Sequence, residues 1–311
     1  MNRNKIVWLV IAVVLLGFIA WLILSGKNES DNPFAVPRSG VGTDTFAVAR
    51  LDLKRLAAFD EAHWRLIESG DTTPSGTGAS SLHSLVDTFV AQGVSQVVVP
   101  LNVGASTFDG LGIYLGGVIK ISDEDIESAI LASNSSKAVK AMTLLSSVSN
   151  CAGGWRFWGV GEGNNSASDR TVARHYEDIF KAGGAAVFQV VILGASHGSS
   201  VVDGKIAPGT PRIVRQFRRL RTAAKGMDSF RVALNPDTAS AEHLSWDFAA
   251  VFEDNESAQK FVSSWRNLAQ DIALTAGPSG DPGLLDKLLA PLITKLTTTL
   301  PTAQGRMVSW Q

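Results

Sequence analysis

The sequence predicts an α+β fold: one transmembrane helix at the N-terminus, then duplicated ferredoxin-like modules with mainly antiparallel sheets and helices on one face. Three observations predict it. The chain opens with an unbroken apolar run, strands joined by short turns alternate with amphipathic helices behind that run, and one stretch of the first half recurs in the second. Short turns favour antiparallel pairing and strand–helix–strand passages favour parallel placement, a mixture that is typical of α+β layering.

The apolar run covers residues 6–24 and contains no charge, proline or amide side chain. As a helix, about 20 residues rising about 1.5 Å each would span the roughly 30 Å hydrocarbon core of a bilayer. A cleaved secretory signal is the alternative, but its apolar core is shorter and ends at small residues, where this chain has Ile23 and Leu24. We therefore expect an anchor over residues 1–25 that contacts the lipid bilayer through residues 6–24.

The charges on either side of the apolar run predict its orientation. Arg3 and Lys5 precede the run, whereas Lys27 is soon followed by Glu29 and Asp31. Because positive charge is retained on the cytoplasmic side of a membrane, we expect the body outside the cytoplasm. The sequence thus predicts a single-pass protein of a bacterial inner membrane, with its body on the periplasmic side.

Composition narrows the possible functions. Residues 26–44 are rich in Ser, Gly, Asn, Asp and Pro, which predicts a flexible linker. The remainder is long enough for two α+β modules, residues 45–150 and 151–311. The formal net charge of −1 disfavours nucleic acid as a partner. Cys151 is the only cysteine, so packing must stabilise the body in place of an intramolecular disulfide.

Apolar periodicity and turn residues predict the elements up to residue 160. Ser122 followed by Asp125 forms a capping box, which predicts a helix start there. Strands are expected at 45–53, 95–101, 111–121 and 154–160, and further helices at 54–68, 82–92 and 138–148.

The same signals continue through the rest of the chain. Thr210 and Pro211 supply an N-cap and a first-turn proline, and residues 255–273 show the clearest apolar stripe at helical spacing. Helices are expected at 169–182, 210–224, 255–273 and 284–297, and strands at 186–193, 229–234, 244–252 and 306–310.

Two stretches of the chain can be aligned without gaps. Residues 91–102 match residues 224–235 with alanine, glycine, valine, leucine and asparagine identical. Each copy covers a helix end, a glycine and the next strand, and each is followed by a turn, a second strand and a helix. Glu127-Ser-Ala in the first such helix returns as Glu256-Ser-Ala in the second. Agreement in element order as well as in residues indicates an internal duplication.

A Gly-x-Ser-x-Gly motif centred on Ser196 directly follows the predicted strand at 186–193. In α/β-hydrolases this motif exposes a nucleophilic serine at a strand-to-helix turn, and Asp237 and His243 follow in the required order. However, the residues after Ser196 have strand and turn character, and no glycine-rich oxyanion segment precedes them. The motif therefore fits a Gly/Ser loop better than a catalytic set.

The predicted helix at 210–224 is basic and amphipathic, which would suit contact with anionic headgroups or an acidic partner. A solvated face on a packed helix is the commoner cause of such a pattern. Its arginines are Arg212, Arg215, Arg218, Arg219 and Arg221.

No motif predicts a metal or a cofactor. The acidic residues from Asp123 to Glu127 stand at a helix start, where carboxylates favour the helix dipole, whereas a metal needs oxygens that converge on one point. The Cys and His spacings of zinc sites and the glycine patterns of nucleotide sites are absent from the sequence.

Three strand-rich stretches carry a resemblance, namely residues 46–53, 188–193 and 244–258. In these the chain resembles uncharacterised membrane-anchored bacterial proteins of planctomycete-like style. The resemblance covers a minor part of the chain and implies no activity, cofactor or catalytic residue.

These features together predict a membrane-tethered, extracytoplasmic binding or structural module, whose partner would be an envelope protein or an anionic molecule. Two alternatives remain open. One is a serine hydrolase that uses Ser196, and the other is a subunit of a membrane assembly or secretion machinery. The sequence does not decide whether the protein is an enzyme.

Overall fold

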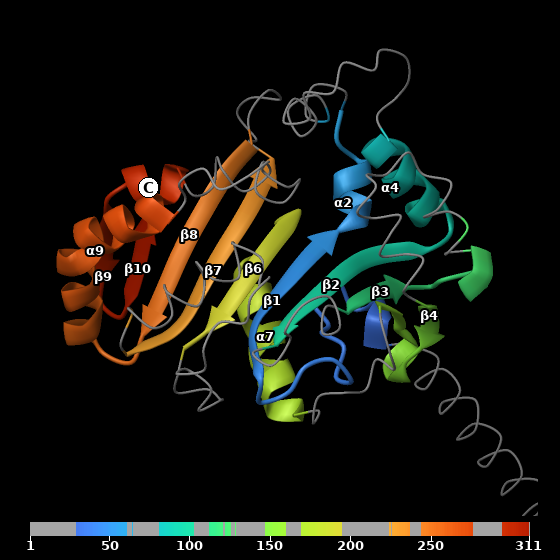
Figure 1. Cartoon of the computed structure of the whole chain (residues 1–311), viewed down its shortest axis with the longest axis horizontal. Coiled ribbons are helices and arrows are strands. Elements are labelled where there is room, and N and C mark those ends of the chain that lie inside the picture. The colour runs from blue at the N-terminus through green and yellow to red at the C-terminus, as the bar shows by residue number, and fades with distance from the viewer. Residues whose placement is uncertain are drawn as a thin grey trace, which may run out of the picture.

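Ten strands form one continuous sheet in the computed structural model of the chain (Figure 1). The structure describes residues 29–60, 64, 81–102, 112–120, 122–125, 128, 147–159, 169–194, 224, 226–236, 244–275 and 294–310. Helices pack on this sheet, so the predicted α+β class is confirmed.

The strands form where β-branched and aromatic residues gather between turn residues. Their bounds are β1 Thr45–Asp52, β2 Val94–Asn102, β3 Ile113–Gly117, β4 Ser147–Asn150, β5 Arg156–Gly159, β6 Phe188–Leu193, β7 Met227–Pro236, β8 Leu244–Phe252, β9 Pro301–Gln304 and β10 Met307–Trp310. Their order across the sheet is β4-β5-β3-β2-β1-β6-β7-β8-β10-β9, and every neighbouring pair is antiparallel. The expectation of parallel placement across a helix is therefore wrong for the described strands.

Helices lie on both faces of the sheet, which corrects the prediction that they share one face. The described helices are α2 Leu53–Ala57, α4 Ser81–Ala91, α7 Arg170–Ala182 and α9 Asn255–Thr275. Because successive strand residues point to opposite faces, Val190 joins the core cluster under α9 while Val191 joins the cluster under α7. Helices α2 and α4 pack near the other end of the sheet from α9 (Figure 1), on its α9 face with Leu51 and Leu115.

The sheet consists of two runs of five strands that meet where β1 pairs with β6. Outward from this junction, the first half reads β1-β2-β3-β5-β4 and the second half reads β6-β7-β8-β10-β9. At the junction Ala49 of β1 lies opposite Val190 of β6. The two halves therefore have the same strand order.

The irregularities of pairing also recur. In the first half, β2 shifts its register against β3 between Val94 and Gln96. In the second half, β7 shifts its register against β8 between Met227 and Ser229. Each shift therefore falls at the start of the second strand of its half.

The stretches that align in sequence occupy equivalent places in the two halves. Residues 91–102 end helix α4 and form β2, and residues 224–235 lead into and form most of β7. Gly93 and Gly226, which are aligned, have φ angles of 91° and 73°, in the left-handed region that glycine enters readily. The alignment thus coincides with agreement in strand order, register and backbone conformation.

The strand order of each half differs from that of a ferredoxin-like unit. The split βαβ arrangement of that unit places another strand between two strands that a helix connects. Here β1 and β2 are joined through α2 and α4, yet they are direct neighbours. The ferredoxin-like part of the prediction is therefore not confirmed, because short-range sequence signals do not specify which distant strands become neighbours.

Among the described residues, no helix is both long and apolar enough to cross a membrane. Helix α9 has the length but carries Glu256, Lys260 and Arg266, and it packs one face on the sheet. This finding contradicts the predicted single-pass membrane organisation and the inner-membrane localisation. The predicted spanning segment itself, residues 6–24, lies outside the described residues.

The described part of the predicted linker packs against the sheet. Within residues 29–41, here called the strap, Ala35, Val36 and Val41 are fully buried in the cluster under α7. These small apolar residues cover sheet surface that would otherwise face water. The predicted boundary at residue 150 falls between β4 and β5, which pair with each other in the first half of the sheet.

Candidate functional site

The residues that the sequence singled out lie outside the described part of the chain. This holds for Ser196, Asp237 and His243, and also for the basic set Arg212, Arg215, Arg218, Arg219 and Arg221. Whether the first three converge, and whether the arginines form a surface, stay predictions.

A different set of polar residues crosses the α7 face of the sheet, one on each of five neighbouring strands. We call this set the polar row. It consists of Gln96 on β2, Arg50 on β1, Gln189 on β6, Arg231 on β7 and Asp247 on β8.

The pairing register places these side chains on one face. Arg50 lies directly opposite Gln189, and Ala233 of β7 lies opposite both Gln189 and Asp247. Arg231 is two residues before Ala233 and so points to the same side. Side chains opposite each other on neighbouring strands start about 5 Å apart, so the members of the row are within reach of one another.

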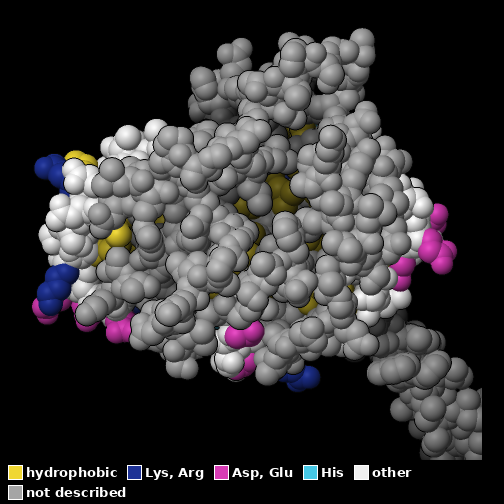
Figure 2. All heavy atoms as spheres, in the orientation of Figure 1, with side chains coloured by type: hydrophobic (Ala, Val, Ile, Leu, Met, Phe, Trp, Pro, Cys, Tyr) yellow, Lys and Arg dark blue, Asp and Glu magenta, His cyan; other side chains and the backbone are white. Residues whose placement is uncertain are grey.

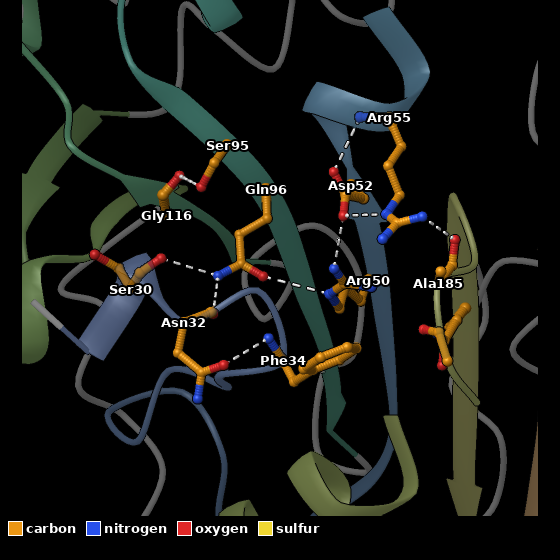
Figure 3. Close-up of polar contacts among 12 residues, drawn as sticks. Ser30, Asn32, Phe34, Arg50, Asp52, Arg55, Ser95, Gln96, Gly116 and Ala185 are labelled. Atoms are coloured by element: carbon orange, nitrogen blue, oxygen red, sulfur yellow. Dashed lines mark hydrogen bonds and ion pairs between the residues drawn. The ribbon is translucent and has the colours of Figure 1, made fainter. Parts of the chain in front are cut away.

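Arg50 lies near the middle of the row and is 2% exposed. Its Nη2 donates a hydrogen bond to Asp52 Oδ2 at 3.0 Å, and its Nε donates one to Gln96 Oε1 at 3.4 Å (Figure 3). Burial lowers the pKa of Arg50, and the charge and hydrogen bond of Asp52 oppose this change. An arginine remains charged at neutral pH, so Asp52 serves as its buried counter-ion.

The Asp52 carboxylate also joins three elements. Its Oδ1 accepts a hydrogen bond from the backbone N–H of Arg55 at 3.1 Å, which caps helix α2. Its Oδ2 lies 3.3 Å from the Arg55 Nε, and the Arg55 Nη1 donates to the Ala185 carbonyl at 2.8 Å (Figure 3). The ion pair in β1 is thereby tied to α2 and to the chain just before β6.

The far end of the row carries a second cation and anion. Burial lowers the pKa of Arg231, and the charge of Asp247 opposes this change. Asn235 Nδ2 donates a hydrogen bond to Asp247 Oδ2 at 2.5 Å. The row therefore has a guanidinium on each side of Gln189, each with an acidic partner.

Three buried side-chain atoms of the row make no hydrogen bond with any described residue. They are Arg50 Nη1, Gln189 Oε1 and Arg231 Nε. Gln189 is fully buried, and its Nε2 donates to the Gly184 carbonyl at 3.1 Å, which fixes the direction of the amide. The middle of the row thus has two donors and one acceptor without partners.

The turn after α7 limits the space above Gln189. A Cβ placed on Gly183 would lie 2.6 Å from Gln189 Oε1 and 3.0 Å from Arg231 Nη1. These two side-chain atoms are therefore no more than 5.6 Å apart, the sum of the two distances.

The strap covers the other end of the row. Gln96 Nε2 donates hydrogen bonds to the Ser30 carbonyl at 3.0 Å and to the Asn32 carbonyl at 2.8 Å (Figure 3). The Phe34 ring lies over the Arg50 guanidinium, with 5.3 Å from Arg50 Cζ to the ring centroid. Arg50 is therefore enclosed between the sheet and the strap.

In the view of Figure 2, charged side chains of the described residues lie along the margin of the molecule with both signs represented, and apolar side chains are visible in a hollow near its centre. The sequence did not indicate the polar row as a site, and three of its members, Gln96, Arg50 and Gln189, are buried.

The described residues support neither of two further kinds of site, a nucleophilic cysteine and a metal centre. Burial raises the pKa of the Cys151 thiol, while hydrogen bonds with Ser39 and the Phe157 backbone oppose this change. The thiolate is the nucleophilic form, so a raised pKa disfavours nucleophilic catalysis by Cys151. No group of three or more His, Cys, Asp or Glu residues in the described part could hold a metal ion.

Sequence reasoning missed the polar row, although a signal for it exists. Arg50 and Asp52 interrupt an apolar strand two residues apart, and Gln189 and Arg231 interrupt two others. Polar residues inside otherwise apolar strands are rarely buried without a partner. The signal does not reveal that the three strands become neighbours, since that depends on the sheet order.

Comparison with models of known protein families, with curated proteins and with solved structures finds no significant match to this chain. The resemblance suggested by residues 46–53, 188–193 and 244–258 therefore stays a prediction.

Proposed function

We propose that the chain is a binding module that holds a small polar ligand at the polar row, between the sheet and the turn at residues 183–184. The observation that carries this proposal is the set of three buried atoms without a partner, Arg50 Nη1, Gln189 Oε1 and Arg231 Nε.

The energetic reason is the cost of leaving such atoms unpaired. Each buried polar group without a hydrogen bond costs about 1–3 kcal/mol, and more when it is charged. Folded proteins pair nearly all of their buried polar atoms. A molecule that accepts from the two guanidinium groups and donates to the amide would recover this cost. The turn at residues 183–184 would have to move to admit it, because the three atoms are covered in this structure.

We also infer that the scaffold arose by internal duplication of a five-stranded unit. The support is the shared strand order of the two halves, their shared register shifts and the gapless alignment of residues 91–102 with 224–235. The row crosses the junction of the two units, with Arg50 in the first and Gln189 and Arg231 in the second. Ligand sites commonly lie where two structural units meet.

A thermal-shift screen of the full-length chain against small polar molecules tests the binding function. The variant Gln189→Met removes the unpaired acceptor, and Gln304→Met on the exposed edge strand β9 is its matched control. We expect at least one compound to raise the melting temperature of the wild type and of Gln304→Met but not of Gln189→Met. At a concentration of 100 times its Kd, a ligand stabilises the fold by about 2.7 kcal/mol.

Two results would contradict the proposal. One is that no compound raises the melting temperature. The other is a shift that persists unchanged in Gln189→Met, which would place the ligand elsewhere on the protein.

A further inference from the structure

We propose that the strap opens as one unit while the sheet stays folded, and that this opening uncovers Tyr114 and the aromatic cluster around it. Opening requires no ligand at the polar row, so this proposal and the proposed binding function can fail separately.

The surface beneath the strap is aromatic. Tyr114 of β3, Phe157 of β5 and Trp155 just before β5 belong to the cluster that the strap completes, and each is at most 5% exposed. Gly40 of the strap lies directly on the Tyr114 ring, because a Cβ on Gly40 would come within 2.4 Å of the ring and its hydroxyl. The strap therefore separates from water side chains that are much larger than its own buried alanine and valines.

The contacts that hold the strap are scattered, and most of them involve its backbone. Gln96 donates to two strap carbonyls (Figure 3). The Val36 N–H donates to Glu177 Oε1 of α7 at 3.3 Å, and the Val41 carbonyl accepts from Asp169 N at 3.2 Å. Such hydrogen bonds contribute little net free energy, because water replaces them when they break. The strap is thus held less firmly than a strand inside the sheet.

Opening of the strap leaves the buried ion pair intact. Phe34 contacts Arg50 only through its ring, and the counter-ion Asp52 lies in β1 together with Arg50. While the strap is closed, Arg50 Nη1 makes no hydrogen bond with any described residue. Water that reaches Arg50 in the open state would pair with this donor and so lower the free energy of opening.

The chain between the strap and β1 provides a hinge. Gly40 and Gly42 flank Val41. Thr45 N donates to the Gly42 carbonyl at 3.0 Å, and Gly42 N donates to Thr45 Oγ1 at 3.0 Å, so this turn belongs to the start of β1. Because glycine adopts a wide range of backbone angles, the strap can turn about Gly42 while β1 stays paired with β2 and β6.

Thiol labelling of the full-length chain with excess iodoacetamide measures the opening. Cys151→Ser first removes the only native thiol. Ala35→Cys then places a thiol in the strap, and Ala47→Cys places one in β1 as the matched control, since both alanines are 0% exposed. We expect the thiol at position 35 to react at least about 100-fold faster than the one at position 47, because a local opening is more frequent than unfolding of the sheet.

The urea dependence of labelling distinguishes local opening from global unfolding. The slope against urea scales with the surface exposed, so it should be small for Ala35→Cys and large for Ala47→Cys. Val36→Cys and Val41→Cys should give the same opening constant and the same small slope as Ala35→Cys, because the strap moves as one unit.

A variant that loosens the strap gives an independent test. Gln96→Leu removes the donor to two strap carbonyls, so it should speed the labelling of Ala35→Cys about tenfold more than that of Ala47→Cys. Gln304→Leu, the same substitution on the exposed edge strand β9, is the control and should change neither rate.

Amide hydrogen exchange of the unmodified chain makes the same comparison without any substitution. Residues 34–41 should exchange at least about 100-fold faster than residues 46–52. Equal labelling rates and equal urea slopes at positions 35 and 47 overturn the proposal, because the strap then leaves only when the sheet unfolds. Labelling at position 35 as fast as that of a free thiol, together with unprotected amides at 34–41, also overturns it, because the strap is then not docked. Different urea slopes at positions 35 and 41 would show that the strap does not move as one unit.

Discussion

The two halves of the sheet fill equivalent places with opposite chemistry. Ala49 of β1 and Val190 of β6 form the central pair of the sheet. The next two residues that point to the α7 face are Arg50 and Asp52 in β1, and the equivalent residues in β6 are Val191 and Leu193. One half buries an ion pair and the other buries hydrocarbon, and both strands occupy the middle of the same sheet.

This difference shows that the ion pair is not required by the strand arrangement. A buried ion pair usually contributes little to stability compared with packed apolar residues of similar volume. Its presence in the first half therefore calls for another explanation, and the strap and the polar row provide one. Gln96 and Arg50 hold the strap, and Arg50 extends the row of donors toward Gln189.

The first and largest expected effect comes from making β1 resemble β6. Asp52→Leu leaves the Arg50 guanidinium buried without its counter-ion, so the free energy of unfolding should fall by about 3–5 kcal/mol. The double variant Arg50→Val with Asp52→Leu should recover most of this loss and remain about 1 kcal/mol below the wild type, because the α2 cap is also lost. Urea unfolding of the single and double variants measures both values.

The reverse substitution is the control for this comparison. Leu193→Asp places a buried carboxylate at the position of β6 that is equivalent to Asp52. Strand β6 has no arginine to pair with it, so this variant should lower the free energy of unfolding as much as Asp52→Leu does. A double variant in β1 that is no more stable than Asp52→Leu would show that the two halves are not interchangeable at this point.

Equivalent tryptophans near the two edges of the sheet should differ in importance. Trp158 of β5 and Trp310 of β10 hold the same place in the pairing, opposite Ile113 of β3 and Phe248 of β8. Trp310 is 4% exposed, whereas Trp158 is only half-buried at the margin of its cluster. We expect Trp310→Ala to cost about 3–5 kcal/mol and Trp158→Ala about half as much.

The reason is the aromatic cluster around Trp310, which has no counterpart at Trp158 among the described residues. The Trp310 ring lies 4.9 Å from the Trp265 ring of α9, and its other aromatic neighbours are Phe230, Phe248 and Phe261. Guanidinium unfolding of both alanine variants, followed by circular dichroism, measures the difference. Equal losses of stability would mean that the contact between Trp310 and Trp265 of α9 adds nothing to what the packing of Trp158 contributes in the first half.

Local sequence signals predicted several helices because the relevant contacts are local, but the helix expected at 138–148 is wrong at residues 147–148, which lie in strand β4. The expected helices at 169–182 and 255–273 correspond to α7 and α9, and Asp169 caps α7 by accepting from Thr171 N at 2.8 Å. The capping box also formed, since Asp125 N donates to Ser122 Oγ at 3.2 Å. Each of these interactions joins residues within one helical turn.

The parts that failed depend on contacts between distant residues. Nothing in the residues around Arg50 specifies that Gln189 will lie opposite, because that neighbour is set by β1 and β6 meeting at the centre of the sheet. The same long-range choice made β1 and β2 antiparallel and put α7 on the face opposite α9. Chemistry-bearing residues could therefore be named in the sequence only where a motif was local.

The aligned glycines give the next smaller effect. A Cβ on Gly93 would lie 1.9 Å from the Val118 carbonyl oxygen, which is backbone, whereas a Cβ on Gly226 would lie 2.8 Å from the Ser257 hydroxyl, which can rotate. Both alanines also pay for a positive φ, about 1–2 kcal/mol. We expect Gly93→Ala to cost about 3 kcal/mol and Gly226→Ala about 1 kcal/mol, measured by urea unfolding.

The double variant Gly226→Ala with Ser257→Ala sharpens this test, because it removes the closest contact, with the Ser257 hydroxyl, and leaves the Ser257 Cβ at 3.1 Å and the backbone strain. The free energy of unfolding of the double variant should lie below that of Ser257→Ala by about the backbone strain, roughly 1 kcal/mol. If Gly226→Ala proves as damaging as Gly93→Ala, the two turns are held equally tightly, and the loss of stability does not depend on whether the contacted atom can move.

The smallest effect concerns the caps of the helices that follow the third strand of each half. In the first half the cap is the neutral hydroxyl of Ser122, and in the second half it is the carboxylate of Asp254, which accepts from Ser257 N at 2.7 Å. The backbone hydrogen bond from Ser257 lowers the pKa of Asp254, and a further hydrogen bond from its side chain acts in the same direction.

A lowered pKa in the folded state means that the ionised cap stabilises α9 fully above the unfolded pKa of about 3.9 and less as the pH falls through the lower folded value. Carbon-13 chemical shifts of the Asp254 carboxylate should therefore titrate below the usual range, and amide exchange at the start of α9 should quicken over that same interval. Asp254→Ser copies the first-half cap and should remove this acid sensitivity while the start of α9 stays protected at neutral pH. An Asp254 that titrates at its ordinary pKa would mean that the hydrogen bond from Ser257 does not persist in solution, and the two caps would then differ in residue type only.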